Sequence, residues 1–382
     1  MMRTTKFLCF ILFFVLCLPV VMAQKPLQTQ NVILVTYDGL RWQEVFSGAD
    51  KTLINDTKFV SDTSHLNSMF WKDNSNERRN ILMPFLWSTV ARQGQIYGNR
   101  KYQNKVNTTN MFWFSYPGYN EILTGIRNDK AIFTNRKTPN PNVTVLEYLN
   151  SLPSYHNRVA VFGSWDVFPY ILNRKRSGLF INAGYEPIRH EHLSSQEMLL
   201  NSQQNQSLSP WPSVRPDAFT FHFAIEYLKQ FAPRVLEISF GETDDIAHDG
   251  KYDGYLEAIN RTDRFIEELW NYLQSDDNYR NKTTLIITTD HGRGHLFRNS
   301  WKKHGRGTPG SGQTWFAVLG PDTEPLGEIK TAGQLYQNQL ARTLATFLNV
   351  DFNLYVNSGN AITQVIGKKT PKETNMVGML TK

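Results

Sequence analysis

Cysteine is almost absent from this sequence: only Cys9 and Cys17 occur among 382 residues, and both lie near its start. The first 23 residues begin with basic side chains, continue as an apolar run of about fifteen residues and end in small residues, a pattern typical of a cleaved secretory signal. An N-terminal membrane anchor is the alternative, but the run is short for a full span. We therefore expect a secreted or periplasmic protein that starts at Gln24 and has no disulfide, so that core packing or bound metal must stabilise it.

No other long apolar run follows, and there is neither an internal repeat nor a dense block of like charge. We therefore expect no stable membrane insertion after signal cleavage. Lys and Arg number 41 against 34 Asp and Glu, and the excess falls to five once Arg3 and Lys6 are removed with the signal. Such a mild positive charge favours small anionic ligands and gives no reason to expect a nucleic acid partner. The 13% aromatic content excludes a disordered, collagenous or coiled-coil chain.

Apolar runs rich in Val and Ile alternate with amphipathic stretches, which is typical of β-α units around a largely parallel sheet. Because these runs are continuously apolar, we expect strands that are covered on both faces. The expected strands are residues 32–36, 159–162, 235–240, 285–289 and 316–319, and the expected helices are 83–93, 218–230, 252–274 and 335–349. The polar segment 193–216 is predicted to be a surface loop, and no linker divides residues 24–382 into separate domains.

Three of the expected strands run into an aspartate. Asp38 follows the first strand, Asp244 comes shortly after the strand at 235–240, and Asp290 follows the strand at 285–289. One such aspartate is a common turn residue. Three are harder to explain in that way, because ligands of open α/β sheets bind beyond the carboxyl ends of the strands. The sequence therefore predicts that these carboxylates meet at one edge of the sheet.

Histidines accompany these aspartates. His248 comes four residues after Asp244, and so on the same face of a helical turn, whereas His291 follows Asp290 at the strand exit. His304 comes shortly afterwards. Carboxylate and imidazole groups together suit zinc or another divalent ion. The pattern therefore predicts a metal site.

One further segment, residues 114–125, reads Phe-Ser-Tyr-Pro-Gly-Tyr-Asn-Glu-Ile-Leu-Thr-Gly. A serine shortly before a proline at the start of a helix is by default the N-cap, with the proline at the first helical position. We expect Ser115 to be that cap. This position is compatible with a functional role, because a helix N-terminus directs backbone N–H groups and a positive dipole end toward an anion.

Taken in order, these segments resemble the alkaline phosphatase superfamily, and most closely its type I phosphodiesterase/nucleotide pyrophosphatase branch. In that branch a Thr or Ser nucleophile precedes an aromatic residue and a proline, and Thr-Gly follows further on. The positions that fit this pattern are Ser115, Tyr116, Pro117, Thr124 and Gly125. The resemblance runs over residues 31–350 and implies an α/β fold, a three-layer α/β/α sandwich with a central, mostly parallel sheet and a single metal-dependent hydrolase domain.

The resemblance also implies two divalent metal ions, normally zinc, with Ser115 as both nucleophile and metal ligand. Each ion would be held by one group of ligands: Asp244, His248 and His304 for one, and Asp38, Asp290 and His291 for the other. The implied reaction is hydrolysis of a small phosphate mono- or diester through a phosphoserine intermediate. A phosphotransferase or mutase of the same superfamily, and a non-catalytic binding protein with the same fold, are the alternatives.

The sequence departs from this branch at Gly118, because nucleotide pyrophosphatases carry an asparagine directly after the motif proline and use it to hold a phosphate oxygen. We expect Gly118 and Tyr119 to be the substrate-binding positions, with the Tyr119 hydroxyl as the replacement donor. The alternative donors are Lys302, Lys303 and Arg293. Sulfatases of the superfamily need an arginine where Tyr119 stands, so a formylglycine sulfatase is disfavoured.

Overall fold

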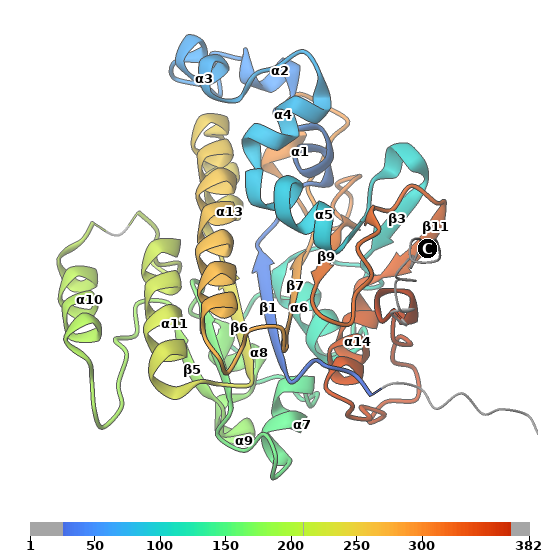
Figure 1. Cartoon of the computed structure of the whole chain (residues 1–382). Helices are drawn as coiled ribbons and strands as arrows, with labels where there is room; N and C mark the ends of the chain where they lie inside the picture. The colour runs from blue at the N-terminus through green and yellow to red at the C-terminus, as the bar shows by residue number, and fades with distance from the viewer. Residues whose placement is uncertain (1–25, 209, 368–382) are drawn as a thin grey trace, which may run out of the picture.

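The apolar runs assemble into a central sheet of eight strands in the order β10-β2-β9-β7-β1-β6-β4-β5 (Figure 1). The protein is described by a computed structural model over residues 26–208 and 210–367, so the predicted secretory signal lies outside the described residues and stays a prediction. The strands are β1 (Asn31–Tyr37), β2 (Gln95–Tyr97), β4 (Val159–Gly163), β5 (Phe180–Ala183), β6 (Val235–Phe240), β7 (Thr283–Thr289), β9 (Phe316–Leu319) and β10 (Gly327–Glu328). Strands β7, β1, β6, β4 and β5 run parallel, whereas β9 is antiparallel to both of its neighbours.

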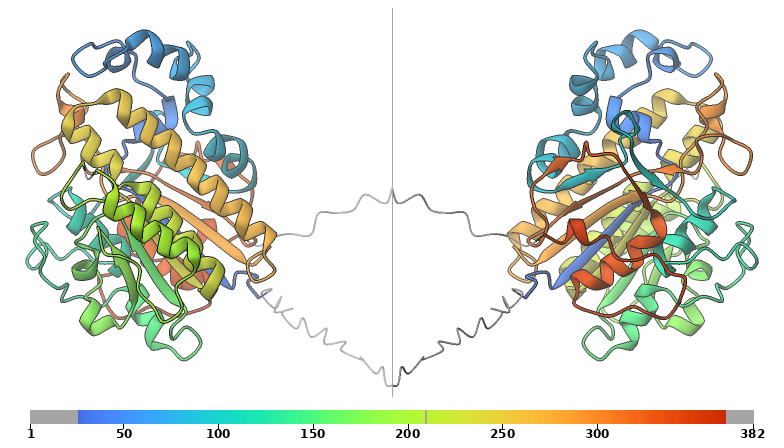
Figure 2. Two further views of the ribbon diagram at one scale, coloured as in Figure 1. Left: turned by 90° about the vertical axis from the view of Figure 1, so that its left-hand side faces the viewer. Right: turned by 90° about the vertical axis from the view of Figure 1, so that its right-hand side faces the viewer.

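Alternate side chains of β1 enter two separate apolar cores. Ile33 and Val35 belong to the core under α11 (Asp217–Phe231) and α13 (Tyr252–Ser275). Val32 and Leu34 pack on the opposite side, under α6 (Ser115–Thr124) and α14 (Leu340–Phe347). Helices therefore cover both faces of the sheet (Figure 2), and the predicted three-layer α/β/α architecture is confirmed.

Shorter elements connect these layers. They are α1 (Trp42–Ser47), α2 (Lys51–Ile54), α3 (Thr63–Phe70), α4 (Ser75–Leu82), α5 (Ala91–Gln93), α7 (Val145–Ser151), α8 (Phe168–Ile171), α9 (Arg174–Ser177), α10 (Ser195–Gln206) and α12 (Glu242–Asp249). A small sheet, ordered β11-β3-β8, combines β3 (Asn104–Asn107), β8 (Gln313–Thr314) and β11 (Gly333–Tyr336). Among the described residues, no helix is both long and apolar enough to cross a bilayer.

The predicted strands are all present, and α11 and α13 match the helices predicted at 218–230 and 252–274. The helix predicted at 335–349 is wrong over its first part, because β11 forms there and pairs with β3. That pairing supplies distant backbone partners, which override the local helical pattern. The helix predicted at 83–93 is also irregular: α4 ends at Leu82, and a π-helical turn at Leu86–Val90 leads into α5.

The segment predicted as a loop, residues 193–216, contains α10 instead. Ser194 Oγ accepts a hydrogen bond from the backbone N–H of Glu197 (3.1 Å), and the Glu197 carboxylate accepts one from the backbone N–H of Ser194 (2.8 Å). This reciprocal cap is written in the sequence as Ser-Ser-Gln-Glu. The loop prediction is wrong because it was based on the polarity of the segment, whereas the capping pattern at its start indicates a helix.

The order of the central strands brings the predicted acidic groups together. β1 lies between β6 and β7, with Tyr37 level with Phe240 on one side and with Thr289 on the other. The three strands therefore end side by side. The residues that follow them, which are Asp38, the start of α12 and Asp290, meet at the carboxyl edge of the sheet.

An acidic side chain also lies inside the sheet. Glu237 on β6 is fully buried; its Oε1 accepts a hydrogen bond from Ser239 (3.2 Å), and its Oε2 has no hydrogen-bond partner among the described residues. Burial raises the pKa of Glu237 from 4.5 to about 8. The folded protein therefore keeps a proton on this carboxyl group over a range of pH in which the unfolded chain has lost it.

Glu237→Gln should remove this pH dependence of stability. Between pH 4.5 and about 8 the folded state binds the extra proton, so the free energy of unfolding of the parent falls as pH rises, by at most about 1.4 kcal/mol per pH unit. The variant should therefore gain stability relative to the parent as pH rises through that window. Chemical denaturation of both proteins at several pH values measures the difference, and a difference that stays constant would contradict the assignment.

Candidate functional site

Asp290 is fixed by the turn that follows β1. The backbone N–H of Gly39 donates to Asp290 Oδ1 (3.0 Å), and the same oxygen accepts the backbone N–H of His291 (2.8 Å). Gly39 has a φ of +62°, and a Cβ at this position would collide with the side chains of Asp244 and Arg293. Glycine is therefore required here for two reasons: the backbone is left-handed, and the neighbouring side chains leave no room for a Cβ atom.

Helix α12 carries Asp244 and His248 on one face, with His248 Nε2 3.1 Å from Asp244 Oδ2. Its N-terminus is held by the buried Asp217, whose carboxylate accepts the backbone N–H groups of Gly241 (2.8 Å) and Glu242 (3.1 Å). This side chain satisfies N–H groups that the start of a helix leaves unpaired. The contacts hold both candidate ligands against the end of β6.

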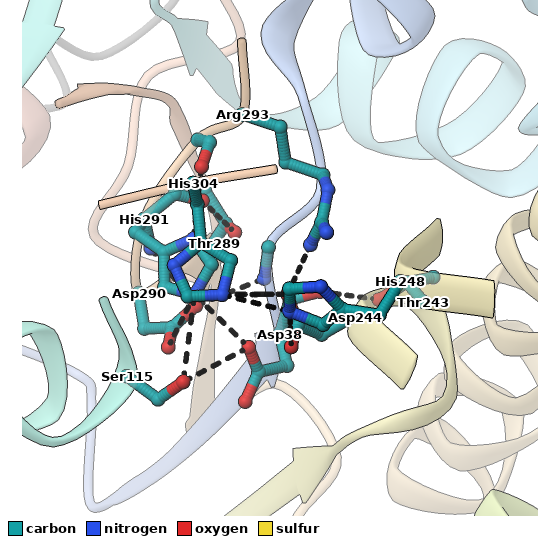
Figure 3. A network of polar contacts seen from close by, with 12 residues as sticks. Asp38, Ser115, Thr243, Asp244, His248, Thr289, Asp290, His291, Arg293 and His304 are labelled. Carbon is teal, nitrogen blue, oxygen red and sulfur yellow. Dashed lines mark hydrogen bonds and ion pairs between the residues drawn. The ribbon is translucent and has the colours of Figure 1, made fainter. Parts of the chain in front are cut away.

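Two histidines point their Nε2 atoms into the site (Figure 3). His291 Nδ1 lies 2.8 Å from the carbonyl oxygen of Gly292, so Nδ1 donates a proton to it and Nε2 faces the site. That Nε2 lies 3.3 Å from Asp38 Oδ1. His304, from the long loop after β7, places its Nε2 2.9 Å from His248 Nε2 and 3.6 Å from Asp244 Oδ1.

Ser115 joins this group at the start of α6. Its Oγ lies 3.5 Å from Asp38 Oδ1 and 3.4 Å from His291 Nε2, and the residue is 5% exposed. The predicted capping role is wrong, because Phe114 occupies the cap position and Ser115 is the first helical residue. Pro117 is the third helical residue, where the absence of an N–H still breaks no helical hydrogen bond.

The charges in the site shift one another's proton affinity. Burial and the Asp244 charge raise the pKa of Asp38, and burial and the Asp38 charge raise the pKa of Asp290. Burial opposes ionisation of Asp244, but the Arg293 guanidinium together with His304 and His248 outweighs it and holds the pKa of Asp244 well below its ordinary value. Burial also disfavours the charged form of His291, yet Asp290 and the other carboxylates raise its pKa to about 9. Carboxylates gathered in a buried site require nearby positive charge.

The site fits divalent metal ions. Two sets of side chains place their ligand atoms within 4.8 Å of one another: Asp38, Asp290 and His291, and Asp244, His291 and His304. His248 adjoins the second set through its contacts with Asp244 and His304. Asp290 Oδ2 is buried without a hydrogen-bond partner among the described residues, which suits an atom that binds a cation. The residues that the sequence marked as ligands are thus brought together by the fold.

Arg293 is buried within the protein, although the sequence made it an alternative donor to a substrate phosphate oxygen. As an alternative phosphate donor it should face open space, yet it is 1% exposed and its Nη1 donates to Asp244. Its Nε and Nη2 donate to the carbonyl oxygens of Trp301 (2.8 Å) and Lys302 (2.7 Å). Arg293 therefore ties Asp244 to the loop that carries His304, and its guanidinium is already engaged within the protein.

Gly118 and Tyr119, the expected substrate-binding residues, are both buried next to the site. Tyr119 is 1% exposed, and its hydroxyl lies 3.5 Å from Asp38 Oδ2, so this group is turned to a carboxylate. A Cβ at Gly118 would collide with the backbone carbonyl of Asp290. The close approach of α6 to β7 explains why a larger residue does not stand at position 118.

Asn135 contacts the helix that begins with Ser115, and no sequence pattern marks it. Its Oδ1 accepts the backbone N–H of Tyr116 at a distance of 3.0 Å. Because the oxygen is engaged in this way, the amide NH2 group of an exposed side chain is available beside the start of α6. The contact joins a loop to a helix that are well separated in the sequence, so only the fold reveals it.

Comparisons with known proteins agree with this fold and identify a family. The family described as type I phosphodiesterase/nucleotide pyrophosphatase matches residues 50–307. Among solved structures, the alkaline phosphatase PafA has a TM-score of 0.56 at 10% identity, over 89% of this chain and 99% of that one. The lipoteichoic acid synthase LtaP from Listeria monocytogenes has a TM-score of 0.54 at 11% identity, over 89% of this chain and 76% of its own.

A phosphonate monoester hydrolase from Silicibacter pomeroyi, SpPMH, also has a TM-score of 0.54, at 12% identity, over 90% of this chain and 78% of that one. At identities this low, the three structures establish a shared fold alone. No curated protein sequence matches this chain significantly.

The purified chain should contain about two divalent ions, and a chelator should remove them and lower the melting temperature. Ions bound to the folded site would compensate carboxylates that otherwise repel one another, so their loss should destabilise the folded state. Elemental analysis counts the ions. Calorimetry measures the melting temperature of the purified protein, of the chelator-treated protein and of the treated protein after zinc is added back. Asp244→Asn should lower the metal content, whereas Asp249→Asn, at the far end of α12, should not. Equal metal loss in both variants, or no metal in active parent protein, would refute the site.

Proposed function

The chain belongs to the type I phosphodiesterase/nucleotide pyrophosphatase family of phosphoester hydrolases, and we propose that it hydrolyses small phosphate mono- or diesters with Ser115 as the nucleophile. The position of Ser115 Oγ carries the proposal, since it lies 3.5 Å from Asp38 and 3.4 Å from His291. The oxygen also stands at the first residue of α6, where the helix dipole favours an attacking alkoxide and an incoming anion.

Asp38, Asp290 and His291 would hold one ion beside Ser115, and Asp244, His248 and His304 would hold the other. When bound, two divalent ions, of which zinc fits the ligands best, stabilise the serine alkoxide and the charge on the entering and leaving oxygens. Arg293 holds Asp244 in place, and the Nδ1 proton of His291 fixes its ring. The chain thus supplies a prearranged set of ligands and a fixed nucleophile.

The proposed reaction has two displacement steps. In the first, Ser115 Oγ forms a bond to phosphorus as the bond to the substrate alcohol breaks, and the alcohol takes up the proton that the serine loses. In the second, water attacks the phosphoserine, the bond from phosphorus to Ser115 breaks, and the serine regains a proton. The products are the free alcohol and a phosphate, which still carries its second ester group where the substrate is a diester.

The position of Ser115 also sets the direction of the displacement. In-line attack places the entering and leaving oxygens on opposite sides of phosphorus, and Ser115 contacts the side that holds Asp38 and His291. The leaving alcohol would therefore depart toward His248 and His304. The His248 side chain is 45% exposed, so this side of the site opens to solvent.

A phosphotransferase or mutase of the same superfamily would use the same nucleophile but pass the phosphoryl group to a second alcohol. A non-catalytic binding protein would need no nucleophile, and its metal ligands would be free to change. The presence of Ser115 and of every expected ligand at one edge of the sheet argues against the binding protein. Release of inorganic phosphate, or of a monoester from a diester, separates hydrolysis from transfer.

Ser115→Ala should abolish nearly all turnover of an aryl phosphate monoester and diester while the metal content stays close to that of the parent, because the six other ligand side chains remain. Ser115→Thr should retain part of the activity, because the hydroxyl survives. Turnover by the two variants is compared with elemental analysis of the same preparations. An alanine variant that is as active as the parent would place the nucleophile elsewhere.

We further propose that the Asn135 amide, rather than the Tyr119 hydroxyl, holds a phosphate oxygen. Asn135 Oδ1 is engaged by the N–H of Tyr116, which leaves the NH2 donor next to the helix end from which Ser115 attacks. The Tyr119 hydroxyl is buried against Asp38 and would have to break that contact to reach a ligand.

Asn135→Ala should therefore lower kcat/KM for an aryl phosphate roughly ten- to a hundredfold, since a hydrogen bond to a charged oxygen contributes about 1.5–3 kcal/mol. Tyr119→Phe is the matched comparison and should have the smaller effect. Both variants should retain the metal content of the parent. The reverse order, with Tyr119→Phe impaired and Asn135→Ala intact, would restore the tyrosine as the donor.

A further inference from the structure

The loop that carries His304 has a one-sided charge. No acidic residue occurs at positions 291–321, whereas five basic residues do. Two of the five are paired: Arg293 with Asp244 and Arg298 with Asp56. The other three make no ion pair with any residue in the described part of the chain: Lys302, Lys303 and Arg306.

The same loop exposes two large apolar side chains next to each other. Leu296 is 55% exposed and Phe297 is 78% exposed. They line a surface hollow of about 310 Å³ together with Lys303. Apolar side chains gathered on an exposed surface often mark a contact with another molecule.

The base of the loop is firmly anchored, so the exposed tip is not simply a loose segment. Trp301 is 1% exposed, and its ring contacts those of Phe59 and Tyr252, with centroids 5.5 and 5.1 Å apart. The backbone N–H of Gly294 donates to the carbonyl oxygen of Lys303 (2.9 Å) and closes the loop. The loop, orange in Figure 2, lies at the outer edge of the molecule.

From this combination we propose that the loop tip, residues 296–306, docks on the surface of a lipid bilayer that contains anionic phospholipid. Apolar side chains that enter the boundary between head groups and acyl chains, with Lys and Arg at head-group level, are the arrangement that binds such a surface. A small anion in water would use the cations but gain nothing from Phe297. A second copy of this chain would bring like charges together at the same loop.

Docking would also orient the site. His304 follows Lys303 in the same loop and contacts His248, on the side toward which the leaving alcohol would depart. A docked protein would thus present this side of the site to phosphate esters at the lipid surface. That substrate class rests on the proposed function, whereas the docking itself does not depend on catalysis.

The test is co-sedimentation of the purified full chain with vesicles of phosphatidylcholine, alone or with about one third phosphatidylglycerol. The parent should bind the anionic vesicles, and about 1 M salt should weaken the binding because it screens the charges. The double variant Leu296→Ser, Phe297→Ser should lower the partition coefficient at least tenfold, since it removes two apolar side chains from the contact. Arg306→Gln should lower it about fivefold.

Val356→Ser is the matched control, because Val356 is 99% exposed and lies outside the loop. It should bind the vesicles as the parent does. Hydrolysis of a soluble aryl phosphate should be the same in the parent and in all these variants, so loss of that activity would count against the proposed function rather than against docking. A parent that stays in solution with anionic vesicles, or a double variant that binds as well as the parent, would overturn the docking proposal, even if the parent dimerises or binds free phosphate.

Discussion

Carboxylates that follow neighbouring parallel strands are forced into one small volume, and their mutual repulsion is the constraint on which the site depends. Asp38 and Asp290 end adjacent strands, and α12 brings Asp244 to the same edge. Two of these groups are held in place by a hydrogen-bonding neighbour: Asp290 by the backbone N–H of Gly39, and Asp244 by the guanidinium of Arg293. An arrangement of this kind is stable only with positive charge at its centre, which imidazole and guanidinium groups supply in part and divalent ions would supply in full.

The helices that serve the site are restrained in the same way. Buried Asp217 on α11 fixes the start of α12, although α11 itself contributes no ligand. On the other face of the sheet, Gly118 lets α6 approach the backbone of Asp290, so that Ser115 comes within 3.5 Å of Asp38. Ligands from opposite faces of the sheet therefore meet at its edge because both helices are tied to the strand ends.

The features that could be predicted from sequence are those with a local signal. Continuous apolar runs marked the central strands, and an aspartate after a strand or a histidine four residues after Asp244 marked the ligands. The secondary-structure predictions were wrong where an element depends on a distant part of the chain or where its local sequence signal was given too little weight. β11 depends on a partner strand far away in the chain, and α10 is capped by Ser194 and Glu197 within a polar segment. The contacts of Arg293 and Asn135 each join a loop to a helix elsewhere in the chain, so composition and spacing could not reveal them.

His304 differs from the other candidate ligands because it comes from a long loop rather than from a strand end or a short helix. The loop has its own anchor, Trp301, and its own closing hydrogen bond between Gly294 and Lys303. Insertions or substitutions between Gly294 and Pro309 would therefore alter what approaches the site while the candidate ligands after β1, on α12 and after β7 stay in place. In evolutionary terms, this division would let related proteins change the surroundings of the site while the strand-end residues stay the same, and it links any such change to one candidate metal ligand, His304.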